Sequence, residues 1–170
     1  MFSFTTALGD CALEWEGDRI TGVHLPGSAR LGRPPAPEPA PAVVREVADL
    51  IARLLSGEHV DLGGVALGHD RRVGEYARQV YAVTREVGPG ETTTYGEIAL
   101  RIDADAAPGA ARAVGAALGA NPTPIIVPCH RVLAADGSLH GFSAPGGIAT
   151  KRRMLQIEGA PGFTQQPLFA

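Results

Sequence analysis

The sequence predicts a mixed α/β (α+β) chain, in which a small N-terminal domain of strands and one helix precedes a mostly helical C-terminal domain with a helix-turn-helix. Two observations lead to this prediction. Apolar and polar residues alternate near the N-terminus, as in half-buried strands, whereas apolar residues recur at helical spacing in several later segments. The chain has 170 residues, of which 45% are apolar, so it is long enough for one large or two small domains with a substantial core.

The N-terminal domain begins with residues 2–25, which we expect to form strands. From Cys11 onward, apolar residues alternate with others, and the sequence Glu-Gly-Asp at residues 16–18 supplies a hairpin turn, so Cys11 should point inward. A Pro-rich surface loop spans residues 26–41. One apolar face then predicts an amphipathic helix over residues 43–55.

A segment with three glycines, residues 62–72, is the predicted linker between the domains. We therefore divide the chain into an N-terminal domain of residues 1–69 and a C-terminal domain of residues 70–170. The second domain opens with another amphipathic helix, whose apolar positions lie between Tyr76 and Val87.

Two short helices joined by a turn follow, which suggests a helix-turn-helix. Residues 92–94, all Thr, can cap a first helix over residues 95–102, and a break over residues 103–109 precedes a second helix over residues 110–120. Arg112 is the only charged residue of the second helix, whereas a helix that reads the major groove normally carries several polar readers. Its small side chains would instead permit close approach to the minor groove, with Arg112 projecting. The alternative is a simple buried helix, and composition alone favours neither.

The feature most indicative of chemistry is Cys129 next to His130, at the end of a short apolar strand punctuated by three prolines. A thiol beside an imidazole is the layout of a nucleophile, because the thiolate is the reactive species. The pair is weak evidence alone, since many structural thiols stay protonated and inert.

Charge and cysteine content limit the function classes. The net charge is −3, but residues 1–69 hold five basic against nine acidic residues and residues 70–170 hold ten against nine, so the second part can still bind phosphates through clustered arginines. The two cysteines lie far apart, so we expect no structural zinc. No apolar run approaches the roughly 18 residues of a membrane span, and no basic segment precedes the first apolar residues. We expect a cytoplasmic protein with no membrane partner.

Residues 76–159 contain a set of motifs in a characteristic order. With these motifs the chain resembles the O6-alkylguanine-DNA alkyltransferases, also called methylated-DNA–protein-cysteine methyltransferases, and the N-terminal portion is loosely similar to their variable first domain. The motifs are Gly90-Glu91-Thr92-Thr93-Thr94-Tyr95-Gly96-Glu97-Ile98-Ala99, Ala111-Arg112-Ala113-Val114-Gly115, Asn121-Pro122, Pro124-Ile125-Ile126-Val127-Pro128-Cys129-His130-Arg131-Val132 and Ile157-Glu158-Gly159.

The resemblance implies direct DNA repair. An alkyl group would move irreversibly, once per molecule, from the O6 atom of guanine, and also from O4 of thymine, to Cys129. The implied partner is double-stranded DNA that contains an alkylated guanine, with no cofactor and no metal, and the protein is expected to be a monomer. Because the target atom is buried in the duplex, the base would be flipped out and Arg112 would fill its place in the stack.

The resemblance also assigns roles to individual residues. His130, polarised by Glu158, would take the thiol proton through a water molecule, Tyr95 would donate to the purine, and Asn121 would brace the active-site loop. Arg131 is expected to pin this segment to a carboxylate. The implied DNA-binding residues are Thr94, Tyr95, Gly96, Ala110, Ala111, Arg112, Ala113 and Gly115, and the implied substrate-pocket residues are Val127, Pro128, Phe142, Ser143 and Ala144.

One departure from the family pattern affects the alkyl pocket, because Ala144-Pro145 is inserted before the usual glycines and leaves open which groups larger than methyl are accepted. Two other functions remain as alternatives. One is an alkylguanine-recognition protein without repair activity, although such relatives lack the cysteine. The other is a Cys-His-Glu hydrolase, which would need an oxyanion hole, and no glycine-rich donor loop adjoins Cys129.

Overall fold

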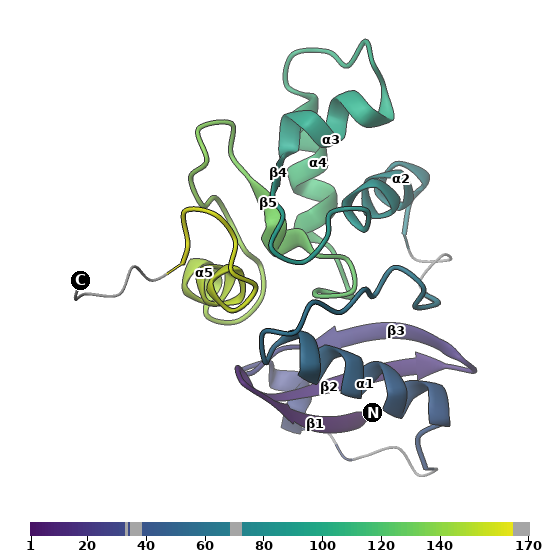
Figure 1. Cartoon of the computed structure of the whole chain (residues 1–170). Helices are drawn as coiled ribbons and strands as arrows, with labels where there is room; N and C mark the ends of the chain where they lie inside the picture. Colours follow the sequence, from purple (N-terminus) through teal and green to yellow (C-terminus); the bar gives the residue numbers. More distant parts are fainter. Residues whose placement is uncertain (33, 35–38, 69–72, 165–170) are drawn as a thin grey trace, which may run out of the picture.

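A computed structural model shows a three-stranded sheet covered by one helix, next to a helical part that is larger (Figure 1). It describes residues 1–32, 34, 39–68 and 73–164. The elements are β1 (Phe2–Thr6), β2 (Gly9–Glu16), β3 (Arg19–His24), η1 (Ala29–Gly32), α1 (Ala42–Leu54), α2 (Glu75–Thr84), β4 (Thr93–Thr94), α3 (Tyr95–Ile102), α4 (Ala110–Gly119), η2 (Cys129–Arg131), β5 (Val132–Leu133) and α5 (Gly147–Ile157).

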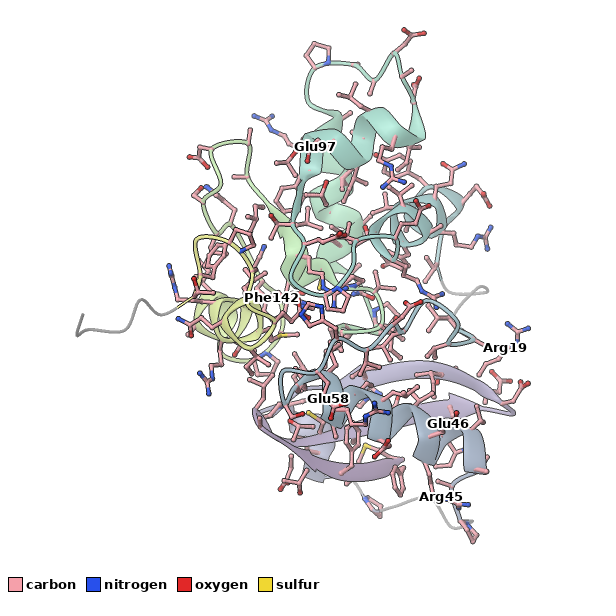
Figure 2. The ribbon with its side chains drawn as sticks, viewed as in Figure 1. Arg19, Arg45, Glu46, Glu58, Glu97 and Phe142 are labelled. Carbon is pink, nitrogen blue, oxygen red and sulfur yellow. The ribbon has the colours of Figure 1, made fainter. Side chains whose placement is uncertain are left out.

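The N-terminal sheet is antiparallel with the order β1-β2-β3, as the alternating pattern predicted. Cys11 and Leu13 of β2 are fully buried in one core with the apolar face of α1, while Arg45 and Glu46 lie on the outer side of that helix (Figure 2). Burial departs from strict alternation at one position, since Ala12 is also fully buried. The predicted hairpin and the predicted helix are both confirmed.

The first half of the predicted linker continues this sheet. The Ile20 N–H donates to the Ala66 carbonyl, and the Gly68 N–H donates to the Ile20 carbonyl, each at 2.9 Å. Residues 66–68 therefore pair with β3, while Arg85, which follows α2, donates to the carbonyls of Leu62, Gly63 and Val65. The predicted domain boundary at residues 69 and 70 lies outside the described residues.

The helix-turn-helix forms as local sequence signals predicted. Thr94 caps α3 by accepting from the Glu97 N–H, and the Glu97 side chain accepts from the Thr94 N–H in return, which completes a capping box. Helix α4 begins after Gly109, whose φ of +99° favours glycine.

Helix α4 is not a buried helix, so that alternative is wrong. Only Val114 and Leu118 of this helix are buried, while Arg112 and Ala113 are exposed. The helix packs through one narrow apolar face on α2 and α3. Its small residues consequently form an open surface.

The segment before Cys129 joins the two parts of the molecule. The Val23 N–H of β3 donates to the Pro122 carbonyl at 2.9 Å, and Ile125 and Ile126 are buried in the core of the N-terminal sheet. Val127 and Cys129 belong to the helical core instead. In the part of the chain that the structure describes, no helix is long and apolar enough to cross a membrane.

Candidate active site

Cys129 is carried by a tight turn and not by the short apolar strand that the sequence predicted. The Val127 N–H donates to the Thr123 carbonyl at 2.9 Å, and Ile125 has a φ of +76°, which is unusual for a β-branched residue. Proline lacks the N–H that a strand ladder needs, so the three prolines here favour turns. The chain then enters the 3-10 turn η2 with Cys129 as its first residue.

The side-chain amide of Asn121 braces this turn, because both its nitrogen and its oxygen form hydrogen bonds to it. The Asn121 Nδ2 group donates to the Val127 carbonyl at 2.9 Å and to Cys129 Sγ at 3.6 Å. Its Oδ1 atom accepts from the Thr123 N–H at 3.0 Å. The side chain therefore fixes the loop and supplies a donor to the sulfur atom.

The Cys129 thiol is buried, with a residue exposure of 9%. Burial raises the pKa of this thiol, while the hydrogen bond from Asn121 and the positive charge of Lys151 act in the opposite direction. The thiol is therefore protonated at neutral pH, and it must lose its proton in order to react as a nucleophile.

His130, Arg131 and Glu158 form a buried network behind the thiol. His130 Nε2 lies 2.9 Å from Glu158 Oε1, and Arg131 donates to both carboxylate oxygens at 2.8 and 3.0 Å. Arg131 also donates to the Val87 carbonyl at 2.5 Å. The prediction that Arg131 pins the segment to a carboxylate is confirmed. A side chain at Gly90 would meet the Glu158 carbonyl at 2.9 Å, which explains the glycine beside this network.

Electrostatics make His130 a neutral base at rest. Burial lowers the pKa of this fully buried imidazole, although the Glu158 carboxylate raises it in part. The pKa of Glu158 is lowered to about 2: burial raises it, and the hydrogen bonds and charges of His130 and Arg131 more than offset that effect. Among the described residues no group hydrogen bonds to His130 Nδ1, so this ring nitrogen can accept a proton while Nε2 faces Glu158.

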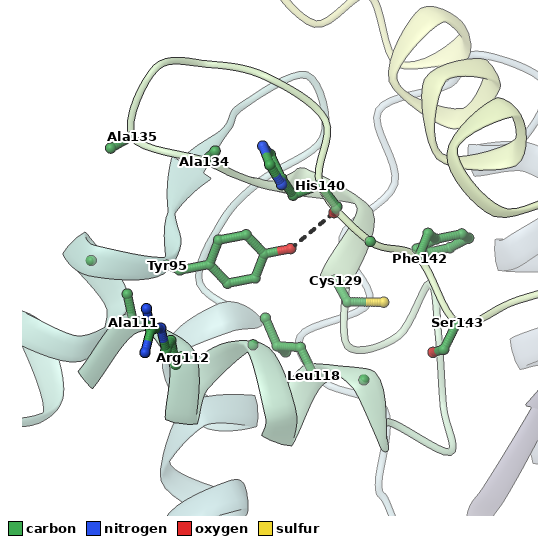
Figure 3. Close-up of a pocket in the computed structure, with 14 residues that line it drawn as sticks. Tyr95, Ala111, Arg112, Leu118, Cys129, Ala134, Ala135, His140, Phe142 and Ser143 are labelled. Atoms are coloured by element: carbon green, nitrogen blue, oxygen red, sulfur yellow. Dashed lines mark hydrogen bonds between the residues drawn. The ribbon is translucent and has the colours of Figure 1, made fainter. Parts of the chain in front are cut away.

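Tyr95, the first residue of α3, lines the pocket on the side of the thiol away from the His130, Arg131 and Glu158 network. The parallel pair formed by β4 and β5 holds it there, since Thr94 is paired with Leu133. The Tyr95 hydroxyl donates to the His140 carbonyl at 3.2 Å (Figure 3). Burial raises the pKa of Tyr95, so the phenol is a hydrogen-bond donor at neutral pH.

Lys151 is a site residue that sequence reasoning missed. Its side chain is fully buried, and Nζ donates to the Val132 carbonyl at 2.6 Å, the His140 carbonyl at 3.2 Å and the Tyr95 hydroxyl at 3.5 Å. No carboxylate pairs with it in the described part of the chain. The sequence did hold one indication that Lys151 is buried, because it shares a helix face with the apolar residues Met154 and Leu155, three and four positions later.

A pocket of about 700 Å3 connects the thiol to α4. Tyr95 and Cys129 lie inside it, Arg112 lies at the α4 side, and the sulfur atom points away from Tyr95 toward the gap between Phe142 and Ser143 (Figure 3). This volume suits a small aromatic ligand held close to the sulfur.

The predicted residues do not all line this pocket. Thr94 caps α3, and Ala110 and Ala113 belong to α4 but do not line the pocket. Val127 is fully buried, and Pro128 lines a different cavity on the far side of the turn, so neither lines a cavity that contains Cys129. Ala144 lines a second cavity behind the thiol. The predicted residues that do line the pocket are Tyr95, Gly96, Ala111, Arg112, Gly115, Cys129, Phe142 and Ser143.

Fold and site together define a helix-turn-helix protein with a buried, hydrogen-bonded thiol at the base of a pocket beside its second helix. Residues 75–160 match the family described as 6-O-methylguanine DNA methyltransferase, DNA binding domain. A methylated-DNA–protein-cysteine methyltransferase of Methanothermobacter thermautotrophicus is 33% identical over 151 residues, which cover 88% of this chain and 80% of the relative. The corresponding protein of Haemophilus influenzae is 48% identical over 86 residues, or 51% of this chain and only 45% of that relative.

Solved structures agree with the sequence comparisons. The crystal structure of Mycobacterium tuberculosis OGT in complex with DNA has a TM-score of 0.72 and 34% identity, and the match covers 95% of this chain and 94% of that one. The chain therefore belongs to the methylated-DNA–protein-cysteine methyltransferase family.

Proposed function

We propose that this protein repairs DNA by transferring the alkyl group of O6-alkylguanine to Cys129 in a single irreversible turnover. The observation that carries the proposal is the position of the thiol, which lies in a pocket that also contains Tyr95 and extends to Arg112 on α4. The relatives named as methylated-DNA–protein-cysteine methyltransferases support the same activity.

The transfer is a displacement at the alkyl carbon. The Cys129 sulfur forms a bond to this carbon as the bond to guanine O6 breaks, and the bonding electrons pass to the purine. The thiol proton leaves through a water molecule to His130 Nδ1, and the imidazolium is stabilised by Glu158, 2.9 Å from Nε2. The imidazolium then gives up this proton, and the purine takes up one proton in exchange, so guanine is released as a neutral base and His130 is neutral again.

Tyr95 stabilises the charge that develops on the purine. Its hydroxyl now donates to the His140 carbonyl, and it would turn that donor to the purine ring when a base enters the pocket. Lys151 remains beside the hydroxyl and keeps a positive charge near both the phenol and the sulfur.

The DNA-binding surface is the exposed face of α4. Ala113 and the other small residues allow close approach to a minor groove, and Arg112 is the single charged group that can enter the stack in place of the flipped base. Contacts of this kind follow groove shape and phosphates, so binding should depend little on sequence. We propose that the same pocket also accepts O4-alkylthymine. That the protein is cytoplasmic and monomeric stays a prediction.

The test is mass spectrometry of the protein after incubation with a short duplex that carries one O6-methylguanine. We expect a gain of about 14 Da, one methylene mass, on the Cys129 peptide at a one-to-one limit, since a deprotonated thiol is the strong nucleophile of that segment. Cys129→Ala should abolish the gain yet keep binding to the alkylated duplex, and methylation of Cys11 in that variant would refute the assignment. DNA binding without any gain in the wild type would instead indicate a recognition protein.

A further inference from the structure

A second cavity of about 300 Å3 lies behind Cys129, and we call it the rear chamber. Cys129, Phe142 and Ser143 line both this cavity and the main pocket, so the two spaces meet at the thiol. The sulfur atom points toward the gap between Phe142 and Ser143, away from Tyr95 (Figure 3). A group attached to the sulfur therefore has the rear chamber in front of it.

One wall of the rear chamber is polar and comes from the N-terminal part of the chain, from β2, β3 and the segment that leads into η1. Arg30 donates to Glu14 Oε1 at 3.0 Å, and His24 Nε2 lies 3.3 Å from the same oxygen. The Thr21 and Ser28 side chains line the same cavity. Hydrogen-bond donors and acceptors thus line the same cavity as Cys129.

Ala144 and Pro145, which the sequence predicts to be an insertion, complete the chamber. Both line it, and Thr150 Oγ1 donates to the Pro145 carbonyl at 2.8 Å, which fixes the insertion on the first turn of α5. Pro145 also abuts the N-terminal part, since a side chain on Gly27 would meet the proline ring at 3.1 Å. The insertion therefore closes a space between the active-site loop and the sheet.

From this geometry we propose that the rear chamber accepts alkyl groups of several carbons that end in a hydroxyl, as these are transferred from guanine O6 to Cys129. The inference rests on the proposed alkyl transfer. The chamber volume is about ten times the share of one water molecule in the liquid, about 30 Å3, so it exceeds the needs of a methyl group. Glu14 and Arg30 line the same chamber as Cys129, so an alkyl chain on the sulfur that fills the chamber meets these polar groups.

A hydroxyl suits this wall because it both donates and accepts. It can donate to the Glu14 carboxylate and accept from the Arg30 guanidinium, both of which line the chamber. An alkyl chain without a polar end would displace water from these groups and return no hydrogen bond. The covalent step is unchanged: a carbon–sulfur bond replaces the carbon–oxygen bond, and the thiol proton ends on guanine.

The test compares single-turnover rates on three duplexes, which carry O6-methyl-, O6-butyl- and O6-(4-hydroxybutyl)guanine. We expect the wild type to react about tenfold faster with the hydroxybutyl than with the butyl adduct, as for one hydrogen bond to a charged group. Absence of methyl transfer would contradict the proposed function, whereas methyl transfer with equal rates on the two longer adducts would overturn the rear chamber alone.

Variants of the polar wall locate the effect. Glu14→Met and Arg30→Met should each bring the ratio of the two longer adducts close to one, and Glu16→Met, in the same strand but outside the chamber, is the matched control that should keep it. The Arg30 side chain is 53% exposed, so its loss leaves the fold intact even if Glu14→Met does not. A ratio that neither wall variant changes would overturn the proposal.

Discussion

Replacement of Lys151 by methionine should slow alkyl transfer but leave the stability of the protein at neutral pH nearly unchanged. Lys151 is fully buried and has three neutral hydrogen-bond acceptors around it, and burial lowers its pKa from the ordinary value of 10.5 to about 8. Each pKa unit corresponds to about 1.4 kcal/mol, so keeping this ammonium charged at neutral pH costs about 3 kcal/mol of folding free energy. Methionine has similar length and removes that cost.

The sign of the pH dependence follows from the lowered pKa. Between about pH 8 and 10.5 the unfolded chain holds a proton on this lysine that the folded chain has lost, so the wild type gains stability as the pH rises through this window. Lys151→Met has no such group. The free energy of unfolding of the wild type, relative to the variant, should therefore rise by about 3 kcal/mol from pH 7 to pH 11.

The assay is urea unfolding of both proteins at several pH values, with Arg153→Met as a control because Arg153 is an exposed basic residue of the same helix. The control should follow the wild type at every pH. At neutral pH the variant should be about as stable as the wild type, because the lost hydrogen bonds offset the removed charge. Alkyl transfer by the variant should be slower, and parallel stability curves for wild type and Lys151→Met would refute the reasoning.

Two further substitutions test the DNA contact and the proton relay. Arg112→Ala should slow transfer from duplex DNA at least about tenfold, because unstacking a base costs a few kcal/mol, while the reaction with free O6-benzylguanine changes little. Arg101→Ala is the control, since Arg101 is exposed on α3 outside the pocket. Equal slowing of the reactions with both substrates would contradict a flipping role for Arg112. Glu158→Gln should slow transfer and change its pH–rate profile, and it should also remove about 3 kcal/mol of stability that the wild type keeps above pH 4.5 and loses as the pH falls toward 2. An identical profile in a folded Glu158→Gln protein would exclude this carboxylate from the relay.

Local signals in the sequence predicted the elements of this fold well. The threonines before Tyr95 predicted the start of α3, because a helix cap needs only neighbouring residues, and Thr94 does cap this helix. The alternation of β2 and the apolar face of α1 likewise follow from periodicity. These features depend on the chain within a few residues of each position.

The conformation around Cys129 could not be predicted in the same way. An apolar run between prolines is compatible with a strand, but Ile125 has a positive φ because the segment is packed between two cores. Distant neighbours also decide the role of Lys151, whose partners Tyr95 and Val132 come from α3 and β5. The rear chamber depends on Glu14 and Pro145, which no local pattern connects.

The site can stabilise a Cys129 thiolate and a His130 imidazolium, although both groups are neutral at rest. Burial raises the pKa of Cys129 and lowers that of His130, so both groups are neutral before a substrate enters. Movement of the thiol proton to the imidazole would create two charges in the protein interior, which is unfavourable unless each charge has a partner. The hydrogen bond from Asn121 and the positive charge of Lys151 would stabilise the thiolate, and the Glu158 carboxylate would stabilise the imidazolium. If the proposed function is correct, Cys129 is consumed after one reaction, and this arrangement would keep the thiol unreactive until an alkylated base enters the pocket.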